Sequence, residues 1–423
     1  MPKSYLADEP ACMRAVLTKF NPYLQTKTRL DSLEMTGHNT DKIELIVLGG
    51  TWSYYKEKYQ KWFIKRCFDA CNTKSEIRIS KSETLQQAQK INENGKHRII
   101  GLTLETRPDF INEKEIDKIR KFGCTRVELG MQSIYNDVLR KNLRGHGIKQ
   151  TIFATKLLKN AGMKITFHMM LGLPGSNPRK DVKMFEELFK NQDFQPDQLK
   201  IYPCVVLKNA PLYKLWKDGK YKPYNDKQLL NLLIKIKSKI PPYVRIIRII
   251  RDIPSQDIIA GNKMSNLRQI LQQKGVKCRC IRCREVRNSQ PNVGQPRAEK
   301  LLRRDYNASG GKEIFLSFED VKNDKILAFL RLRITNSWTL PVLENCALIR
   351  ELHTYGQVVA ISDKNKNAQQ HKSLGKQLMA EAERIAKKEF NFLKIAVIAG
   401  IGVREYYRKL GYKLKDEYMI KKL

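Results

Sequence analysis

The chain has 423 residues, of which 41% are hydrophobic, and its 80 Lys and Arg outnumber 43 Asp and Glu to give a formal net charge of +37. That length is sufficient for two or three domains with separate cores. No apolar run approaches the ~18 residues of a membrane span, and nine scattered Cys follow no signal peptide, so a membrane protein and a secreted disulfide scaffold are both excluded. We expect a cytoplasmic protein.

The excess of positive charge predicts a polyanionic partner. A lysine-rich proteome is the competing explanation for part of the excess. A field of this size over a whole chain nevertheless attracts polyanions, and binding through it weakens steeply with salt. The composition therefore favours nucleic acid as the partner.

Short apolar strands alternate with helices over residues 1–260. The expected strands are 43–48, 99–104, 126–129, 165–170 and 198–202, and the expected helices include 56–71, 113–122 and 148–161. This alternation predicts an α/β fold, with a parallel sheet and crossover helices that form an open or partial barrel.

Polar residues directly follow three of these strands, at 105–109, 128–133 and 168–175. Because the carboxyl ends of parallel strands meet at one edge of a sheet, they predict an active site at that edge. For His168 alone, a hydrogen-bonded residue at a strand end is the better interpretation. Further on, Arg245, Arg248 and Arg251 recur every third residue in an apolar strand, as in a salt-bridged sheet edge.

Three thiols, Cys278, Cys280 and Cys283, lie close together in the sequence among arginines that lower thiolate pKa values. This spacing favours a metal knuckle over three free cysteines. A tetrahedral site needs a fourth ligand, for which Cys12, Cys124 and a histidine are the alternatives.

The last third of the chain combines strands with a turn that suits a phosphate group. Strands are expected at 314–318, 326–333, 348–356 and 394–398. Between the last two, a tight turn at 370–378 opens an amphipathic helix. Its unpaired N–H groups, with Lys372 and Lys376, would bind a pyrophosphate. Taken alone, such a turn is more often an ordinary capped helix.

This order of strand, phosphate turn, helix, strand and paired tyrosines resembles the GNAT acetyltransferases. Longer runs resemble the acetyltransferase domain of the Elongator catalytic subunit family: RELH (350–353), QHK (370–372) and GVREYYRKLGY (402–412). Other runs resemble the radical S-adenosylmethionine (SAM) domain of the same family: ELIVLGGT (44–51), LETRPDF (104–110), VELGMQS (127–133), RGH (144–146) and LPGSNP (173–178). The resemblance covers essentially the whole chain.

The resemblance implies three parts. They are a partial TIM-like radical SAM barrel over 1–260, a linker with a zinc knuckle over 261–300, and a GNAT domain over 301–423. The family's tRNA-binding surface includes residues 222–251, so the arginines and lysines of this region, with Arg245, Arg248 and Arg251 among them, become candidates for phosphate contacts.

The resemblance also implies site residues. Acetyl-CoA would be bound by Lys42, Glu351, Leu352, His353, Thr354, Leu374, Gly375, Lys376 and Tyr407, and Gln132 is a cofactor-binding candidate at the sheet edge. Tyr407, with Tyr406 in reserve, would protonate the departing CoA thiolate, and Glu351 is a candidate base. Packed core tyrosines and a solvent-facing strand carboxylate are the alternatives.

The chain departs from the family pattern in two places. Family members carry three cysteines for a 4Fe-4S cluster upstream of the KSY run (3–5), which here follows Met1 almost directly. The chain has other cysteines, but these do not replace the three cluster ligands: Cys12, Cys67, Cys71 and Cys124. Either the segment was cut away, which the retained sheet-edge motifs favour, or a natural variant has lost the radical step. In addition, Ser373 stands where the phosphate turn usually has glycine.

The resemblance implies an enzyme of tRNA wobble uridine C5 carboxymethylation, in which tRNA stimulates hydrolysis of acetyl-CoA. The partner would be the anticodon region of tRNA and, in a eukaryote, other Elongator subunits. Two alternatives remain. One is a protein lysine acetyltransferase, which leaves the front domain without a role, and the other is a noncatalytic tRNA-binding relative.

Overall fold

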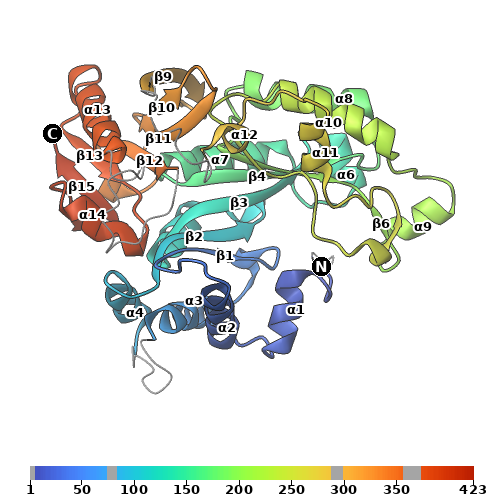
Figure 1. The fold of residues 1–423 in the computed structure, drawn as a ribbon, viewed down its shortest axis with the longest axis horizontal. Helices are drawn as coiled ribbons and strands as arrows, with labels where there is room; N and C mark the ends of the chain where they lie inside the picture. The colour runs from blue at the N-terminus through green and yellow to red at the C-terminus, as the bar shows by residue number, and fades with distance from the viewer. Residues whose placement is uncertain (1–4, 74–82, 287–298, 356–372) are drawn as a thin grey trace.

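The computed structural model describes residues 5–73, 83–286, 299–355 and 373–423. It contains a parallel sheet, a mixed sheet and a two-stranded ribbon. In Figure 1 the strands β1–β4 of the parallel sheet run through the middle of the molecule, and the C-terminal elements, in orange and red, pack beside them. No helix in the described ranges is long and apolar enough to cross a membrane.

The parallel sheet has six strands in the order β1-β2-β3-β4-β5-β7. These strands are β1 (Lys42–Val47), β2 (Arg98–Thr106), β3 (Cys124–Gln132), β4 (Lys164–Leu171), β5 (Gln198–Pro203) and β7 (Arg245–Arg248). Every neighbouring pair is parallel, and β1 and β7 are the two edges. The predicted α/β fold with an open, partial barrel is confirmed.

Helices and short connections surround this sheet. The helices are α1 (Pro10–Leu17), α2 (Pro22–Met35), α3 (Glu57–Asn72), α4 (Leu85–Asn92), α5 (Glu113–Lys121), α6 (Asn136–Lys141), α7 (Ile148–Asn160), α8 (Pro178–Lys190), α9 (Leu212–Lys217), α10 (Asp226–Ser238) and α11 (Leu267–Gln273). The connections include η1 (Trp52–Tyr54), η2 (Pro108–Phe110), η3 (Ser255–Asp257) and the ribbon of β6 (Val206–Leu207) with β8 (Ile258–Ala260). Asn112, Asn177 and Asn225 cap α5, α8 and α10 by accepting from backbone N–H groups.

The mixed sheet has the order β14-β15-β13-β12-β11-β10-β9. Its strands are β9 (Glu299–Ala308), β10 (Gly311–Asp320), β11 (Lys325–Ile334), β12 (Cys346–Thr354), β13 (Lys394–Val397), β14 (Lys413–Lys415) and β15 (Tyr418–Lys422). All pairs are antiparallel except β12 with β13. The remaining elements are α12 (Ile281–Arg284), η4 (Pro341–Leu343), α13 (Leu374–Lys388), η6 (Ile401–Val403) and α14 (Arg404–Arg408).

The segment predicted as a linker packs on both halves over its described residues. Leu267 and Leu271 of α11 are buried in the core of the half that contains the parallel sheet, here called the parallel half. Ile281 of α12 instead packs with Phe315 and Phe329 of the mixed sheet. The connector predicted at 288–297 lies outside the described residues, as do residues 370–372 of the predicted phosphate turn.

A buried network of ion pairs joins the two halves. Asp197, just before β5, lies 2.5 Å from Arg350 of β12 and 3.6 Å from Lys159 of α7. Arg350 also pairs with Glu313 of β10 at 3.0 Å. These side chains are at most 1% exposed. Because a buried charge is costly without its partner, each half satisfies charges of the other.

A close backbone contact adds to this interface. A Cβ built on Gly400, just before η6, would lie 1.9 Å from the carbonyl oxygen of Ile100 on β2. A Cβ on Gly402 would lie 2.5 Å from Cβ of Arg98. Glu93, at the end of α4, pairs with two arginines of α14 at 3.2 and 2.8 Å. The half of the molecule that contains the parallel sheet therefore fixes the position of α14.

Candidate functional site

One half of β12 has an unpaired backbone edge within the described part of the chain. β13 pairs with residues 346–349 of β12, whereas β11 pairs with β12 as far as Thr354. The edge of residues 351–354 that points toward β13 therefore lies open among the described strands. An extended amide-containing arm can hydrogen-bond to such an edge.

The first turn of α13 lies against this open edge. A Cβ built on Gly375 would lie 3.2 Å from the hydroxyl of Tyr406, 3.7 Å from Oγ1 of Thr354 and 3.9 Å from Cδ2 of Leu352. Leu374 is buried and anchors the turn in the core. Several residues predicted for one cofactor thus lie together, although they come from three elements.

Ser373 precedes α13 in a left-handed conformation, with φ of 58°. Glycine adopts this conformation without a steric cost, whereas a side chain costs roughly 1–2 kcal/mol. The structure therefore gives a physical reason why glycine suits this position, and Ser373 keeps the same backbone geometry under strain. Lys376 is exposed on the first turn, as the phosphate prediction requires.

The two tyrosines of α14 differ in their surroundings. Tyr406 directs its hydroxyl toward Gly375. Tyr407 is 6% exposed, and its ring centroid lies 5.2 Å from that of Tyr406 and 6.0 Å from that of Tyr412. Burial raises the pKa of Tyr406 and of Tyr407, so both hydroxyls keep their protons at neutral pH. A proton donor needs that state.

Glu351 does not suit the role of a base. Its side chain is 6% exposed and accepts hydrogen bonds from Arg331 at 2.9 Å and Lys164 at 3.3 Å. Burial alone would raise its pKa, but Lys164 and Arg331 lower the pKa to about 2. So weak a base accepts a proton poorly at neutral pH. The buried, doubly paired side chain excludes the solvent-facing alternative, and it disfavours Glu351 as the base.

His353 points away from the turn. Alternate residues of a strand face opposite sides, so Leu352 and Thr354 face Gly375 and His353 does not. Its ring packs 4.3 Å from Tyr355 and 5.9 Å from Phe329, and burial lowers its pKa. The backbone of His353, and not its imidazole, is the part available to a ligand on the open edge.

Lys42 begins β1 on the side of the parallel half that meets α14. It pairs in register with Arg98, whose side chain lies against Gly402. Burial alone would raise the pKa of Glu44 on the same strand, but Lys164, Arg126 and, from the mixed sheet, His353 lower it. The structure thus brings the start of β1 close to the mixed sheet, which sequence separation alone could not indicate.

A second polar group lies toward the carboxyl edge of the parallel sheet. His168 Nε2 lies 2.7 Å from Glu128, and Nδ1 lies 3.6 Å from Glu105. Lys200 also pairs with Glu128. The prediction of a hydrogen-bonded His168 is confirmed. Gln132, at the end of β3, has φ of 66°, and such backbone strain often accompanies functional sites.

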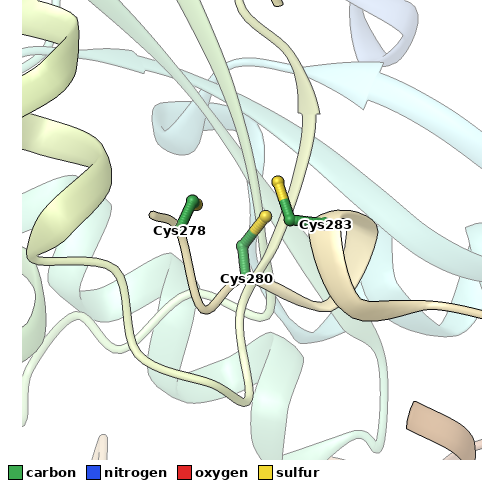
Figure 2. A group of neighbouring side chains, drawn as sticks. All are labelled: Cys278, Cys280 and Cys283. Atoms are coloured by element: carbon green, nitrogen blue, oxygen red, sulfur yellow. The ribbon is translucent and has the colours of Figure 1, made fainter. Parts of the chain in front are cut away.

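The three predicted metal-binding cysteines meet at the start of α12 (Figure 2). The thiols of Cys278, Cys280 and Cys283 lie within 4.8 Å of one another. Hydrogen bonds from the other two thiols, together with Lys237 and Arg268, lower the pKa of Cys283. This donor set fits zinc, which prefers thiolates. Among the described residues no fourth His, Cys or carboxylate joins the group, so neither Cys12, Cys124 nor a histidine completes it in this structure.

The described cysteines do not fit a 4Fe-4S cluster at the carboxyl edge. The three-thiol group lies at the opposite edge, because Ile281 donates its N–H to Val244, directly before β7. Cys67, Cys71 and Cys124 are buried, and burial raises their pKa values. Cluster iron requires thiolates. Cys67 and Cys71 are packed thiols, as their helical spacing predicts.

The regularly spaced arginines are all ion-paired. Arg245 lies 2.6 Å from Glu285, and Arg251 lies 2.7 Å from Glu9. Arg248 pairs with Asp252. The salt-bridged sheet edge is therefore the interpretation that the structure favours over three arginines held for phosphate.

Comparisons with known proteins agree with this architecture. The family model of the radical SAM superfamily matches residues 12–188, and that of the radical SAM C-terminal domain matches residues 196–275. A tRNA uridine(34) acetyltransferase of Methanocaldococcus infernus is 50% identical over the whole chain, which covers 80% of that protein. One from Dehalococcoides mccartyi is 44% identical, with 92% covered, and Elongator complex protein 3 of Homo sapiens is 40% identical, with 77% covered.

A solved structure agrees as well. Archaeal Methanocaldococcus infernus Elp3 with an N-terminus deletion (1-46) matches with a TM-score of 0.89 at 50% identity, over 97% of each chain. The parallel half is thus a radical SAM domain. The chain belongs to the family of tRNA uridine(34) acetyltransferases and Elongator complex protein 3.

The buried ion pairs between the halves were not predicted. Arg331 and Arg333 alternate with apolar residues in a strand, and Arg350 interrupts another apolar run. Because unpaired arginine is rarely buried, such charges inside apolar strands indicate buried partners. The sequence could have given that signal, but not the identity of the partners.

Proposed function

We propose that the chain is a tRNA-binding, acetyl-CoA-dependent enzyme of wobble uridine C5 carboxymethylation, and that tRNA stimulates its hydrolysis of acetyl-CoA. The observation that carries the proposal is the convergence of the open edge of β12, the Gly375 turn and the tyrosines of α14. The relatives' name, tRNA uridine(34) acetyltransferase, supports the nucleic-acid substrate. The net charge of +37 suits a tRNA.

In this proposal the mixed sheet is a GNAT domain that begins near residue 301. The backbone at 351–354 pairs with the pantetheine arm, and the first turn of α13 receives the pyrophosphate at its N–H groups. Lys376 adds a positive charge at this turn, and Lys42 contacts the ligand from the half that contains the parallel sheet. The ligand then spans the interface, which couples acetyl-CoA to the half expected to hold tRNA.

Tyr407 is the proposed proton donor, with Tyr406 in reserve. Water attacks the thioester carbonyl, and a backbone N–H of the open edge stabilises the charge that develops on its oxygen. As the carbon–sulfur bond breaks, the tyrosine hydroxyl donates its proton to the thiolate. The acetic acid that forms releases its proton to solvent, and solvent returns a proton to the tyrosinate. Glu351 stays ionised and holds Arg331 and Lys164, so it supports the edge and takes no proton.

The cysteine group is proposed as a structural zinc site. Three thiolates with Zn²⁺ carry a net negative charge, which Lys237 and Arg268 offset at 3.9 and 4.0 Å from the sulfur of Cys283. We expect about one zinc ion per purified chain, by atomic emission. Replacing Cys280 with Ser should remove it. Protein that folds and binds acetyl-CoA without zinc would contradict this role.

For the radical half, the expected family cofactors are SAM and a 4Fe-4S cluster. Gln132 and the strand ends at the carboxyl edge are the proposed contacts to SAM. Since the described cysteines do not fit the cluster, we derive no radical step from these residues. The anticodon region of tRNA is the proposed partner, with Elongator subunits added if the source is eukaryotic.

Replacing Gly375 with Val tests the acetyl-CoA site. The added side chain would collide with the Tyr406 hydroxyl and fill the space between the turn and Thr354. We expect acetyl-CoA to bind at least about tenfold more weakly, by titration calorimetry, because the backbone can no longer approach the phosphate.

Ala380→Val is the matched control, since Ala380 is exposed on the same helix and also gains a β-branched side chain. It should bind acetyl-CoA as the unmodified protein does. Equal affinity in all three proteins would show that the ligand does not occupy this turn. A protein that binds tRNA but no acetyl-CoA at all would instead indicate a noncatalytic relative.

A further inference from the structure

The segment after β1 carries an exposed aromatic surface that the proposed function does not use. Tyr55 precedes α3, and Tyr59 and Trp62 follow on it at helical spacing. These residues are 45%, 39% and 43% exposed. The ring centroids lie 5.3 Å apart for Tyr55 and Tyr59, and 5.6 Å apart for Tyr59 and Trp62. We call these three side chains the aromatic ladder.

The aromatic ladder rests on a fixed base. Trp52 of η1 is buried, and its ring lies 6.3 Å from Tyr55 and 5.6 Å from Phe63. The buried amide of Gln60 donates a hydrogen bond to the carbonyl of Trp52 at 2.9 Å. The rings are therefore held in place before a ligand arrives, which lowers the entropy lost on binding.

One end of the aromatic ladder lines a cavity at the carboxyl edge of the parallel sheet. Tyr55 and Tyr59 share this cavity with Gly49 and Gly50, directly after β1, and with Glu105 near the end of β2. Ligands of open parallel sheets bind at this edge. The ladder thus leads from the surface to the edge at which the chemistry of this half is expected.

The charge around the aromatic ladder is basic. Lys56, Lys58 and Lys61 are exposed on the same segment, and Glu57 pairs with Lys61 at 2.6 Å. Aromatic faces beside lysines bind unpaired nucleobases and their phosphates, because each base has a flat apolar face and each nucleotide carries a negative charge. A duplex offers no such faces, since its bases are stacked on one another.

We propose that the aromatic ladder stacks unpaired bases of the tRNA substrate and holds the single-stranded loop beside the carboxyl edge. This inference rests on the proposed function, in which tRNA is the substrate. It adds the surface that binds the loop and the kind of contact that this surface makes.

The test is RNA binding by the full chain, measured by fluorescence anisotropy. The probes are an RNA hairpin with a single-stranded loop and a blunt RNA duplex of the same length. For Trp62→Ala, the Kd of the hairpin should rise roughly five- to one-hundredfold, the effect of losing one stacked base. Duplex binding and the salt dependence should stay the same, because no phosphate contact is removed.

Three variants serve as controls. Trp62→Phe keeps a ring and should retain most of the hairpin affinity. Phe153→Ala removes an aromatic residue of α7 that is 55% exposed, and it should bind both RNAs normally. Lys58→Gln should weaken hairpin binding and reduce its salt dependence, which distinguishes a charge contact from stacking.

Unchanged hairpin affinity in both Trp62→Ala and Tyr59→Ala would overturn the aromatic ladder. If tRNA still stimulated acetyl-CoA hydrolysis in these variants, the proposed function would stand without it. Failure of the unmodified protein to bind the hairpin would overturn both proposals. Loss of binding to anionic phospholipid vesicles in Trp62→Ala, with the hairpin unaffected, would instead identify the surface as a membrane contact.

Discussion

Replacing Asp197 with Asn is expected to destabilise the protein by about 3–5 kcal/mol, because it leaves buried cations without their partner. Asp197 lies 2.5 Å from Arg350, 3.6 Å from Lys159 and 3.7 Å from Arg331, and it is fully buried. The free energy of unfolding in urea measures this loss. A loss below about 1 kcal/mol, the size of a surface pair, would show that the network does not hold the halves together.

Asp305→Asn is the matched control. It changes an acid that pairs with Arg303 at 2.8 Å, but both side chains are about one-third exposed. Solvent screens such a pair, so we expect less than about 1 kcal/mol.

The carboxylate of Asp197 also determines how the stability of the protein changes at low pH. Burial alone would raise the pKa of Asp197, but Arg350, Lys159 and Arg331 lower it well below its usual range. An acid with a lowered folded pKa contributes its full stability above its unfolded pKa of about 4, and the contribution is lost as the pH falls below that value. Asp197→Asn should therefore be less sensitive to acid than the unmodified protein.

Replacing Tyr407 with Phe is expected to lower the rate of CoA release about 100- to 10,000-fold, the range for loss of a general acid. The affinity for acetyl-CoA should change little, because the ring still packs against Tyr406 and Tyr412. Thiol release under saturating acetyl-CoA measures the rate, and calorimetry measures the affinity.

Tyr406→Phe distinguishes the two tyrosines. Its hydroxyl faces Gly375, so its removal should weaken binding more than it lowers the maximal rate. If Tyr406→Phe lowers the maximal rate and Tyr407→Phe does not, Tyr406 is the donor and Tyr407 is a packed core residue.

The sequence predicted the regular elements well, because their apolar periodicity is local. The strand expected at 165–170 is β4 (Lys164–Leu171), and Leu378, Ala382 and Ile385 of the predicted amphipathic helix are buried. The helices α1 and α2 were missed. The apolar pattern of α2 is weak, and α1 has only eight residues, none of them buried.

Side-chain environments could not be predicted in the same way. The strand that carries Glu351 was predicted, but the partner of this side chain, Lys164, lies 187 positions away in the other half. Arg350 and Asp197 are 153 positions apart. A solvent-facing acid and a buried, doubly paired acid give the same local pattern, and only the packing of the two sheets distinguishes them. For Ser373, by contrast, the departure from glycine already singled out the position at which the structure shows a left-handed backbone.

The most direct test of a tRNA-gated acetyl-CoA site is the rate of CoA release by the purified chain, measured with and without tRNA, beside Lys42→Ala. We expect tRNA to raise the rate, and we expect Lys42→Ala to lose most of that rate while it still binds tRNA. A rate that does not change with bound tRNA, or one that Lys42→Ala leaves intact, would contradict the coupling of the two halves through acetyl-CoA.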